Sequence, residues 1–133
     1  MTFPRISAAL IVSLCVFGLA IQSPNASAES GGDGGYIKIE PFTVNLLGGV
    51  QYLQMSMRIR GGSPEVAGSV SSRMPMVRHE LILLLSGQKS ADILSVKGKI
   101  VLLEDIKMAI NKAIEMKGQN GVTEVALESF VVQ

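Results

Sequence analysis

Residues 53–60 alternate strictly between apolar and polar side chains, a period of two that is typical of a strand with one buried face. The apolar face consists of Leu53, Met55, Met57 and Ile59. The polar face consists of Gln54, Ser56, Arg58 and Arg60. We therefore predict a strand whose apolar side packs in a core and whose polar side contacts water or a partner.

An upstream stretch, residues 36–46, also alternates, but its apolar phase changes across Pro41. Proline cannot donate to a strand ladder and occurs at edges and bulges, so we expect a bulged strand here. Gly48 and Gly49 favour the positive φ angles of a tight hairpin turn between these two strands. Near the end of the chain, residues 122–133 alternate again and predict a third strand.

Between the second and third strands, apolar residues recur at spacings of three and four, which predicts a helix. They are Val66, Val70, Met74, Val77, Leu81 and Leu84. We expect Ser63 to cap this helix and Pro64 to occupy its first position. Pro75 falls inside the pattern, where it removes a backbone hydrogen bond, so we expect a kink or a break there.

The segment from Leu81 to Leu85 is apolar on every side of this helix. Such a helix is either enclosed by the core or also buried against another subunit. Because one small sheet covers only one side of a helix, we favour a subunit contact. The predicted self-association residues are Leu81, Ile82, Leu84 and Leu85.

A second helix is predicted from about Lys99 to Lys117, after a short turn capped by Ser90 and a loop over residues 95–99. Its inward face is expected to contain Leu103, Ile106, Ile110, Ala113 and Ile114. Gly118 fits the left-handed position that ends such a helix. The order strand-strand-helix-helix-strand predicts an α+β fold, in which two helices pack on a small antiparallel sheet.

The chain begins with an apolar run, residues 6–21, which predicts an N-terminal hydrophobic helix. These 16 residues span about 24 Å, whereas a bilayer core is about 30 Å thick. Ala26 and Ala28 form the small-x-small pattern of a signal cleavage site, so residues 1–28 are either a signal peptide cleaved after Ala28 or a retained membrane anchor. Both alternatives export the remainder, which divides into a Gly-rich linker over residues 29–35 and a domain over residues 36–133.

Charge and cysteine content narrow the function classes. The chain has 12 Lys and Arg against 11 Asp and Glu, and the exported part, which lacks Arg5, has 11 of each. A nucleic-acid partner is not expected, because phosphate contacts supply most of the affinity of such binders and require a basic excess. The single cysteine, Cys15, lies in the apolar run, so the exported part has no thiol for a disulfide, a nucleophile or a metal.

The sequence contains no recognisable catalytic arrangement. His79 is the only histidine, and a lone histidine on a helix is more typical of a surface residue than of a metal ligand. Glu104 and Asp105 point about 100° apart on a helix, which suits a solvated face better than acid-base chemistry. We therefore predict no catalytic residues, no enzymatic activity, no cofactor and no metal.

Basic residues offer a candidate docking surface for the carboxylates of a partner. The candidates are Arg58 and Arg60 on the polar strand face, with Arg73 and Arg78 on the first helix. The alternative is that these arginines form an ordinary solvated basic face.

Together, these segments resemble the flagellar basal-body-associated FliL family. The resemblance covers residues 36–133 and rests on the order and spacing of YIKIEPFTVNL, QYLQMSMRIR, MPMVRHELILLLSGQ, SADILSVKGKIVLLEDIKMAIN and ESFVVQ. It implies a periplasmic domain similar to the stomatin-type scaffold domain, held beside the inner membrane at the basal body of the bacterial flagellum. It also implies a homo-oligomeric ring around the ion-driven stator units that supports torque and influences flagellar rotation, swimming, swarming and chemotaxis.

If the resemblance holds, it carries structural importance over to Pro41, Phe42, Leu53, Pro75, Arg78, Leu84 and Leu85. The N-terminus departs from the family pattern, because only five residues precede a short apolar run. Attachment to the inner membrane through residues 6–21 and release into the periplasm after Ala28 therefore both stay open. The alternative function is a periplasmic scaffold or binding domain of the same fold with a partner outside the flagellum.

Overall fold

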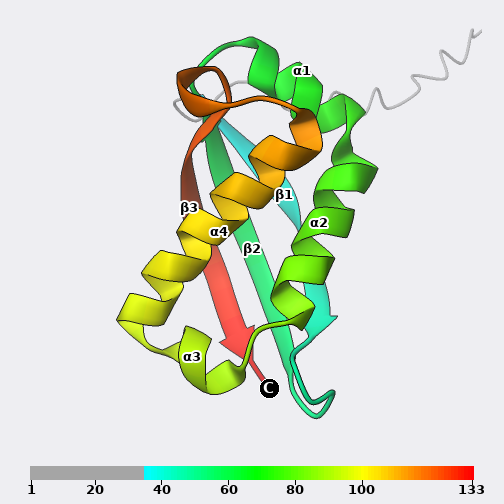
Figure 1. Ribbon diagram of the computed structural model, residues 1–133, viewed down its shortest axis with the longest axis vertical. Coiled ribbons are helices and arrows are strands. Elements are labelled where there is room, and N and C mark those ends of the chain that lie inside the picture. The colour runs from blue at the N-terminus through cyan, green and yellow to red at the C-terminus, as the bar shows by residue number, and fades with distance from the viewer. Residues whose placement is uncertain (1–34) are drawn as a thin grey trace, which may run out of the picture.

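A three-stranded antiparallel sheet forms one layer of the molecule, and helices cover one of its faces (Figure 1). The structure is a computed structural model and describes residues 35–133; the predicted signal peptide or anchor and most of the predicted linker lie outside them. The strands are β1 (Tyr36–Asn45), β2 (Tyr52–Gly61) and β3 (Val122–Val132), in the order β1-β2-β3. The helices are α1 (Glu65–Ser72), α2 (Met74–Ser86), α3 (Ser90–Leu94) and α4 (Val96–Ile114), followed by a short 3-10 turn, η1 (Gly118–Asn120). The α+β prediction is confirmed, with four helices between β2 and β3 instead of two.

The predicted irregularity in β1 is confirmed. The register passes from Ile39 opposite Met57 to Phe42 opposite Met55, so β1 has one residue more than β2 across Pro41. The hairpin that follows turns at Gly48 and Gly49, whose φ angles are 97° and 69°. The sequence pattern therefore predicted both the bulge and the turn correctly.

The core lies between the sheet and the helices. The predicted apolar face of β2 is fully buried. Helices α2 and α4 lie over the sheet and supply most of the opposite side of the core (Figure 1). Their buried residues are Val77, Leu81 and Leu85 from α2, and Leu102, Ile106, Ile110, Ala113 and Ile114 from α4.

The predicted break in the first helix is confirmed, and it lies at Arg73 (φ −107°, ψ 18°). Pro75 therefore falls in the first turn of α2, where its missing N–H costs no helical hydrogen bond. The predicted cap was wrong by one residue. Pro64 occupies the cap position, and the Ser63 hydroxyl instead donates to the carbonyl of Asn120 at 3.3 Å.

The boundaries predicted for the last helix were also wrong. Residues 96–99 are helical, because the Ser95 hydroxyl accepts a hydrogen bond from the N–H of Gly98 at 2.9 Å and caps α4. Leu102 takes the fully buried position that was assigned to Leu103. The left-handed residue at the end of α4 is Glu115 (φ 58°), and the backbone N–H of Met116 returns to the carbonyl of Asn111.

Candidate interaction surfaces

The face of the sheet away from the helices carries two of the four candidate arginines. Arg58 and Arg60 lie on β2, and each forms an ion pair with a glutamate of the neighbouring strand, Glu128 and Glu124 respectively. In both pairs the two side chains are partly exposed. These arginines are therefore neutralised within the chain, and a partner that binds them has to compete with β3.

Tyr36 joins the same polar face from β1. Its hydroxyl donates to Glu124 Oε1 at 2.9 Å, and the Arg60 guanidinium lies 5.1 Å from the centre of its ring. The hydrogen bond to Glu124 is the main cause that raises the pKa of the Tyr36 hydroxyl, because the hydroxyl can donate this bond only while it keeps its proton. The three side chains tie the ends of all three strands together.

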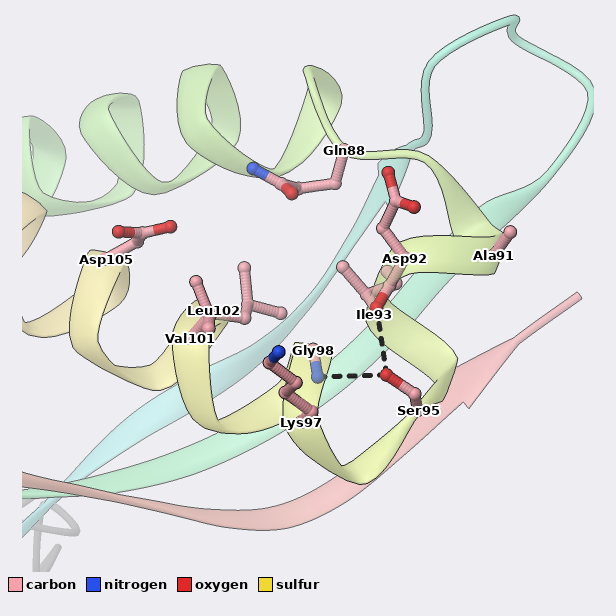
Figure 2. A pocket seen from close by; sticks show the side chains of 10 residues that line it. All are labelled: Gln88, Ala91, Asp92, Ile93, Ser95, Lys97, Gly98, Val101, Leu102 and Asp105. Atoms are coloured by element: carbon pink, nitrogen blue, oxygen red, sulfur yellow. Dashed lines mark hydrogen bonds between the residues drawn. The ribbon is translucent and has the colours of Figure 1, made fainter.

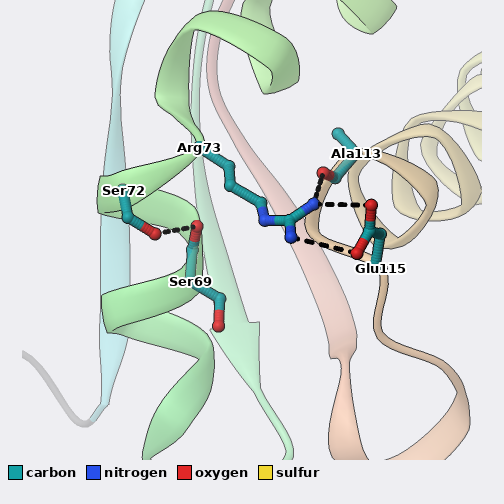
Figure 3. Close-up of polar contacts among 5 residues, drawn as sticks. All are labelled: Ser69, Ser72, Arg73, Ala113 and Glu115. Atoms are coloured by element: carbon teal, nitrogen blue, oxygen red, sulfur yellow. Dashed lines mark hydrogen bonds and ion pairs between the residues drawn. The ribbon is translucent and has the colours of Figure 1, made fainter.

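Arg73 lies at the break between α1 and α2 and points towards the end of α4 (Figure 3). Its Nη1 is 2.9 Å from Glu115 Oε1, its Nη2 is 3.0 Å from Glu115 Oε2, and Nη1 also donates to the carbonyl of Ala113 at 3.5 Å. This two-point contact holds the pKa of the Glu115 carboxyl below its usual range and raises the pKa of Arg73. The role of this arginine within the chain is to join two helix ends.

The fourth arginine, Arg78, lies on α2 above the sheet edge. Its guanidinium is 5.5 Å from the centre of the Phe42 ring on β1. The structure therefore brings Arg58 and Arg60 together but places Arg73 and Arg78 on other parts of the molecule. The four residues do not form one basic patch.

The four predicted self-association residues separate into two groups. Leu81 and Leu85 are fully buried in the core of the chain itself, so they offer no surface to another subunit. Leu84 is partly buried and packs against the core, whereas Ile82 is 44% exposed. Helix α2 is covered on one side by the sheet and on another by α4, so more of its surface is buried within the chain than a sheet alone could bury. Ile82 and Leu84 stay predicted self-association positions.

Sequence reasoning missed further exposed apolar side chains. Leu83 follows Ile82 on α2 and is 60% exposed. Val50 in the β1–β2 hairpin is 83% exposed, and Val96 at the start of α4 is 76% exposed. The hairpin and α3 lie at the same end of the molecule (Figure 1), where the N–H of Leu47 donates to the carbonyl of Gln88 at 2.9 Å. A single valine in a turn gives no pattern from which this exposure can be predicted.

An open pocket of about 350 Å³ lies between α3, the start of α4 and the end of α2 (Figure 2). Its charged residues are Asp92, Lys97 and Asp105. Within residues 35–133, no three histidine, cysteine or carboxylate side chains are placed to hold a metal ion together. His79 is exposed on α2, away from this pocket.

None of the helices in the described part of the chain has both the length and the apolar character needed to cross a membrane. The predicted cleavage site at Ala26 and Ala28 and the predicted anchor over residues 6–21 lie outside that part. Both alternatives for the N-terminal segment therefore stay predictions.

Comparison with known proteins identifies a family. Residues 36–133 match the family model for the flagellar basal body-associated protein FliL, whereas a search of curated proteins found no match. The matched range includes every strand and helix that the structure describes, from the first residue of β1 to the end of the chain. Because the match covers well over half of the sequence, this chain belongs to the FliL family of flagellar basal-body-associated proteins.

Proposed function

We propose that this chain is a non-enzymatic accessory of the flagellar motor that contacts the stator and supports torque. The observation that carries the proposal is the family match over the complete sheet and all its helices. The proposed effects are on flagellar rotation, swimming, swarming and chemotaxis. The proposed place is the periplasmic side of the inner membrane, with residues 6–21 as an anchor, or the soluble periplasm if the chain is cleaved after Ala28.

Exposed apolar side chains support a role in binding other proteins. Ile82, Leu83, Val50 and Val96 are all exposed on helices or turns of the described domain, where water contact is unfavourable. We propose that part of this surface is covered in a homo-oligomer around the stator units.

Deletion of the coding sequence tests the proposed function. The expected result is reduced swimming and swarming with normal growth, restored by expression of the full chain. Unchanged motility would contradict a motor role and would favour a periplasmic scaffold with another partner. N-terminal sequencing of protein from separated membrane and periplasmic fractions distinguishes the retained anchor from cleavage after Ala28.

Charge reversal tests the candidate docking arginines separately. Arg58→Glu and Arg78→Glu are expected to weaken co-purification of the full chain with stator proteins, whereas Lys89→Glu, an exposed position that is not among the four candidates, serves as the matched control. Equal co-purification of all three variants with the wild-type amount would exclude docking through these arginines.

A further inference from the structure

The two edges of the sheet are covered to different degrees. Of the β1 side chains that face the helices, Ile39, Phe42 and Val44 are buried and Ile37 is partly buried. On β3, the corresponding side chains are only partly buried, although they pack against the core; they are Val125, Leu127, Phe130 and Val132. The partly buried apolar margin therefore extends along most of β3, whereas on β1 it is confined to Ile37.

The backbone of β3 is also unpaired on that margin. Tyr52 of β2 and Gln133 exchange both backbone hydrogen bonds at 2.9 Å, so the adjacent Val132 directs its N–H and C=O away from β2. In the part of the chain that the structure describes, no strand pairs with this side of β3. An 11-residue strand with an open edge is a template for another strand.

Side-chain chemistry defines the strand that fits there. On the helix side it needs apolar residues to meet the margin of β3. On the opposite side it lies beside Glu124 and Glu128, which already pair with Arg60 and Arg58, so a further acidic residue is disfavoured there and a basic residue can share these carboxylates. Residues 37–39 of β1 have this pattern, because Ile37 and Ile39 face the helices and Lys38 between them is exposed on the other face.

We infer that β3 of one copy pairs with β1 of the next copy, so that the sheet continues from chain to chain. Both strands are antiparallel to β2, so they run in the same direction and the new pair is parallel. A contact between two different edges propagates head to tail, which closes into a ring or continues as a filament. An antiparallel β3–β3 pair centred at Ala126 would instead bring Glu124 of one copy beside Glu128 of the other, which is unfavourable.

The helix layer borders both edges. Arg78 of α2 packs over Phe42 of β1, and the exposed Ile82, one turn further along, therefore lies on the β1 side of the helix layer. Lys99 of α4 packs over Phe130 of β3, so this part of α4 lies on the β3 side. Continuing the sheet brings these two sides of the helix layer together. The inference rests on the proposed function only for the role that the assembly would serve.

Cysteine pairs in the full chain test this contact, with Cys15→Ser as the background. Lys38 and Ala126 both pair with Arg58 across β2, so within one chain they are two strand spacings apart, about 9.6 Å. That separation exceeds the reach of a disulfide, about 7 Å between Cα atoms. The inference places the two strands of neighbouring copies at the level that they share within one chain, where the same residues would be one spacing apart. The pair Thr43 and Val131, both opposite Gln54, gives a second test at another level of the sheet.

The expected result, after oxidation of cells expressing Lys38→Cys with Ala126→Cys, is a ladder beyond dimers on a non-reducing gel. Thr43→Cys with Val131→Cys is expected to behave alike, and co-expressed single variants should stop at dimers. Adding Lys38→Glu to the second pair should reduce its cross-linking several-fold, while the control Lys89→Glu should leave it unchanged.

Two results would overturn the inference: no ladder from either pair, or dimers from Ala126→Cys alone, which would show a β3–β3 contact. Motility of a deletion strain is scored in parallel. Impaired motility without a ladder supports the proposed function and contradicts the sheet contact. A ladder with normal motility supports the sheet contact and contradicts the proposed function.

Discussion

Arg73 and Glu115 lie 42 residues apart in the chain, and both nitrogens of the guanidinium end contact the two carboxylate oxygens, at 2.9 and 3.0 Å. The contact joins the break between α1 and α2 to the end of α4 (Figure 3). Glu115 also has a φ of 58°, a left-handed conformation that is uncommon for a residue other than glycine. The ion pair therefore explains why a glutamate is useful at a position where glycine would fold more easily.

The Arg73→Ala variant is expected to have a lower Tm than the wild type at pH 7, and the difference should shrink as the pH falls to 3. The pKa of Glu115 is lower in the folded chain, so the pair stabilises the fold fully above the ordinary glutamate pKa of about 4.3. This contribution is lost as the pH falls through the lowered pKa. Thermal unfolding at both pH values measures it, and an equal difference at pH 3 and pH 7 would contradict the assignment.

A second substitution separates the ion pair from the backbone conformation. Once Arg73 is replaced by alanine, Glu115→Gly should raise the Tm, because glycine adopts a positive φ without steric cost. With Arg73 present, the same substitution removes the ion pair as well and should gain less. Equal gains in the two backgrounds would show that the contact with Arg73 does not stabilise the folded chain.

Truncation of two adjacent residues on α2 should have very different effects on stability. Leu81 is fully buried, so Leu81→Ala is expected to reduce the free energy of unfolding by about 3 kcal/mol. Ile82 is exposed, so Ile82→Ala should change it by no more than about 0.5 kcal/mol. Urea unfolding of both variants tests the comparison. A large loss for Ile82→Ala at high protein concentration that disappears on dilution would show that another subunit covers this side chain.

Strands were predicted from the sequence more accurately than helix ends. The alternation of apolar and polar residues in β2 correctly predicted which side chains are buried. Pro41 predicted the bulge in β1, and Gly48–Gly49 predicted the turn after it. Gly98 was misleading, because glycine beside two lysines is typical of a loop. The structure shows a different reason for this glycine: an added Cβ would lie 1.7 Å from the carbonyl oxygen of Asp92, where α3 meets α4.

The interaction surface was predictable in part. A sequence shows that Arg58 and Arg73 are charged, but their partners Glu128 and Glu115 lie 70 and 42 residues further along the chain. Only the folded chain shows that both arginines are already paired. Likewise, the all-apolar segment Leu81–Leu85 indicates burial on more than one side of the helix. In the folded chain only Leu81 and Leu85 are fully buried, whereas Ile82 and Leu83 are exposed, and the sequence alone does not distinguish these two groups.

Alanine at two helical glycines should have opposite effects on stability. Gly98→Ala is expected to destabilise the fold by about 1–3 kcal/mol, because the backbone of Asp92 has to move. Gly68 in α1 has no atom within 4 Å of an added Cβ, so Gly68→Ala should stabilise by about 0.4–1 kcal/mol through helix propensity. The free energies of unfolding of the two variants provide the measurement. Stabilisation by Gly98→Ala would show that the approach of α3 to α4 is looser than described.

The side chain of Asn111 on α4 holds the start of β3, and removal of this side chain should expose the backbone amide of Val122. Asn111 Nδ2 donates to the carbonyl of Val122 at 3.0 Å, and Asn111 Oδ1 accepts from the N–H of Val122 at 2.7 Å. Asn111→Ala leaves both of these partly buried backbone groups without that partner, so we expect a loss of about 1–3 kcal/mol. Hydrogen exchange at the Val122 amide should accelerate with it.

A matched control distinguishes this bond from an ordinary surface hydrogen bond. The Ser72 hydroxyl donates to the carbonyl of Ser69 at 3.2 Å on the exposed side of α1 (Figure 3), so Ser72→Ala should change stability by less than about 0.5 kcal/mol. Asn111→Asp keeps the acceptor for the Val122 N–H but loses the donor to its carbonyl, and it should fall between Asn111→Ala and the wild type. If Asn111→Ala costs no more than Ser72→Ala, the side-chain amide does not hold the start of β3.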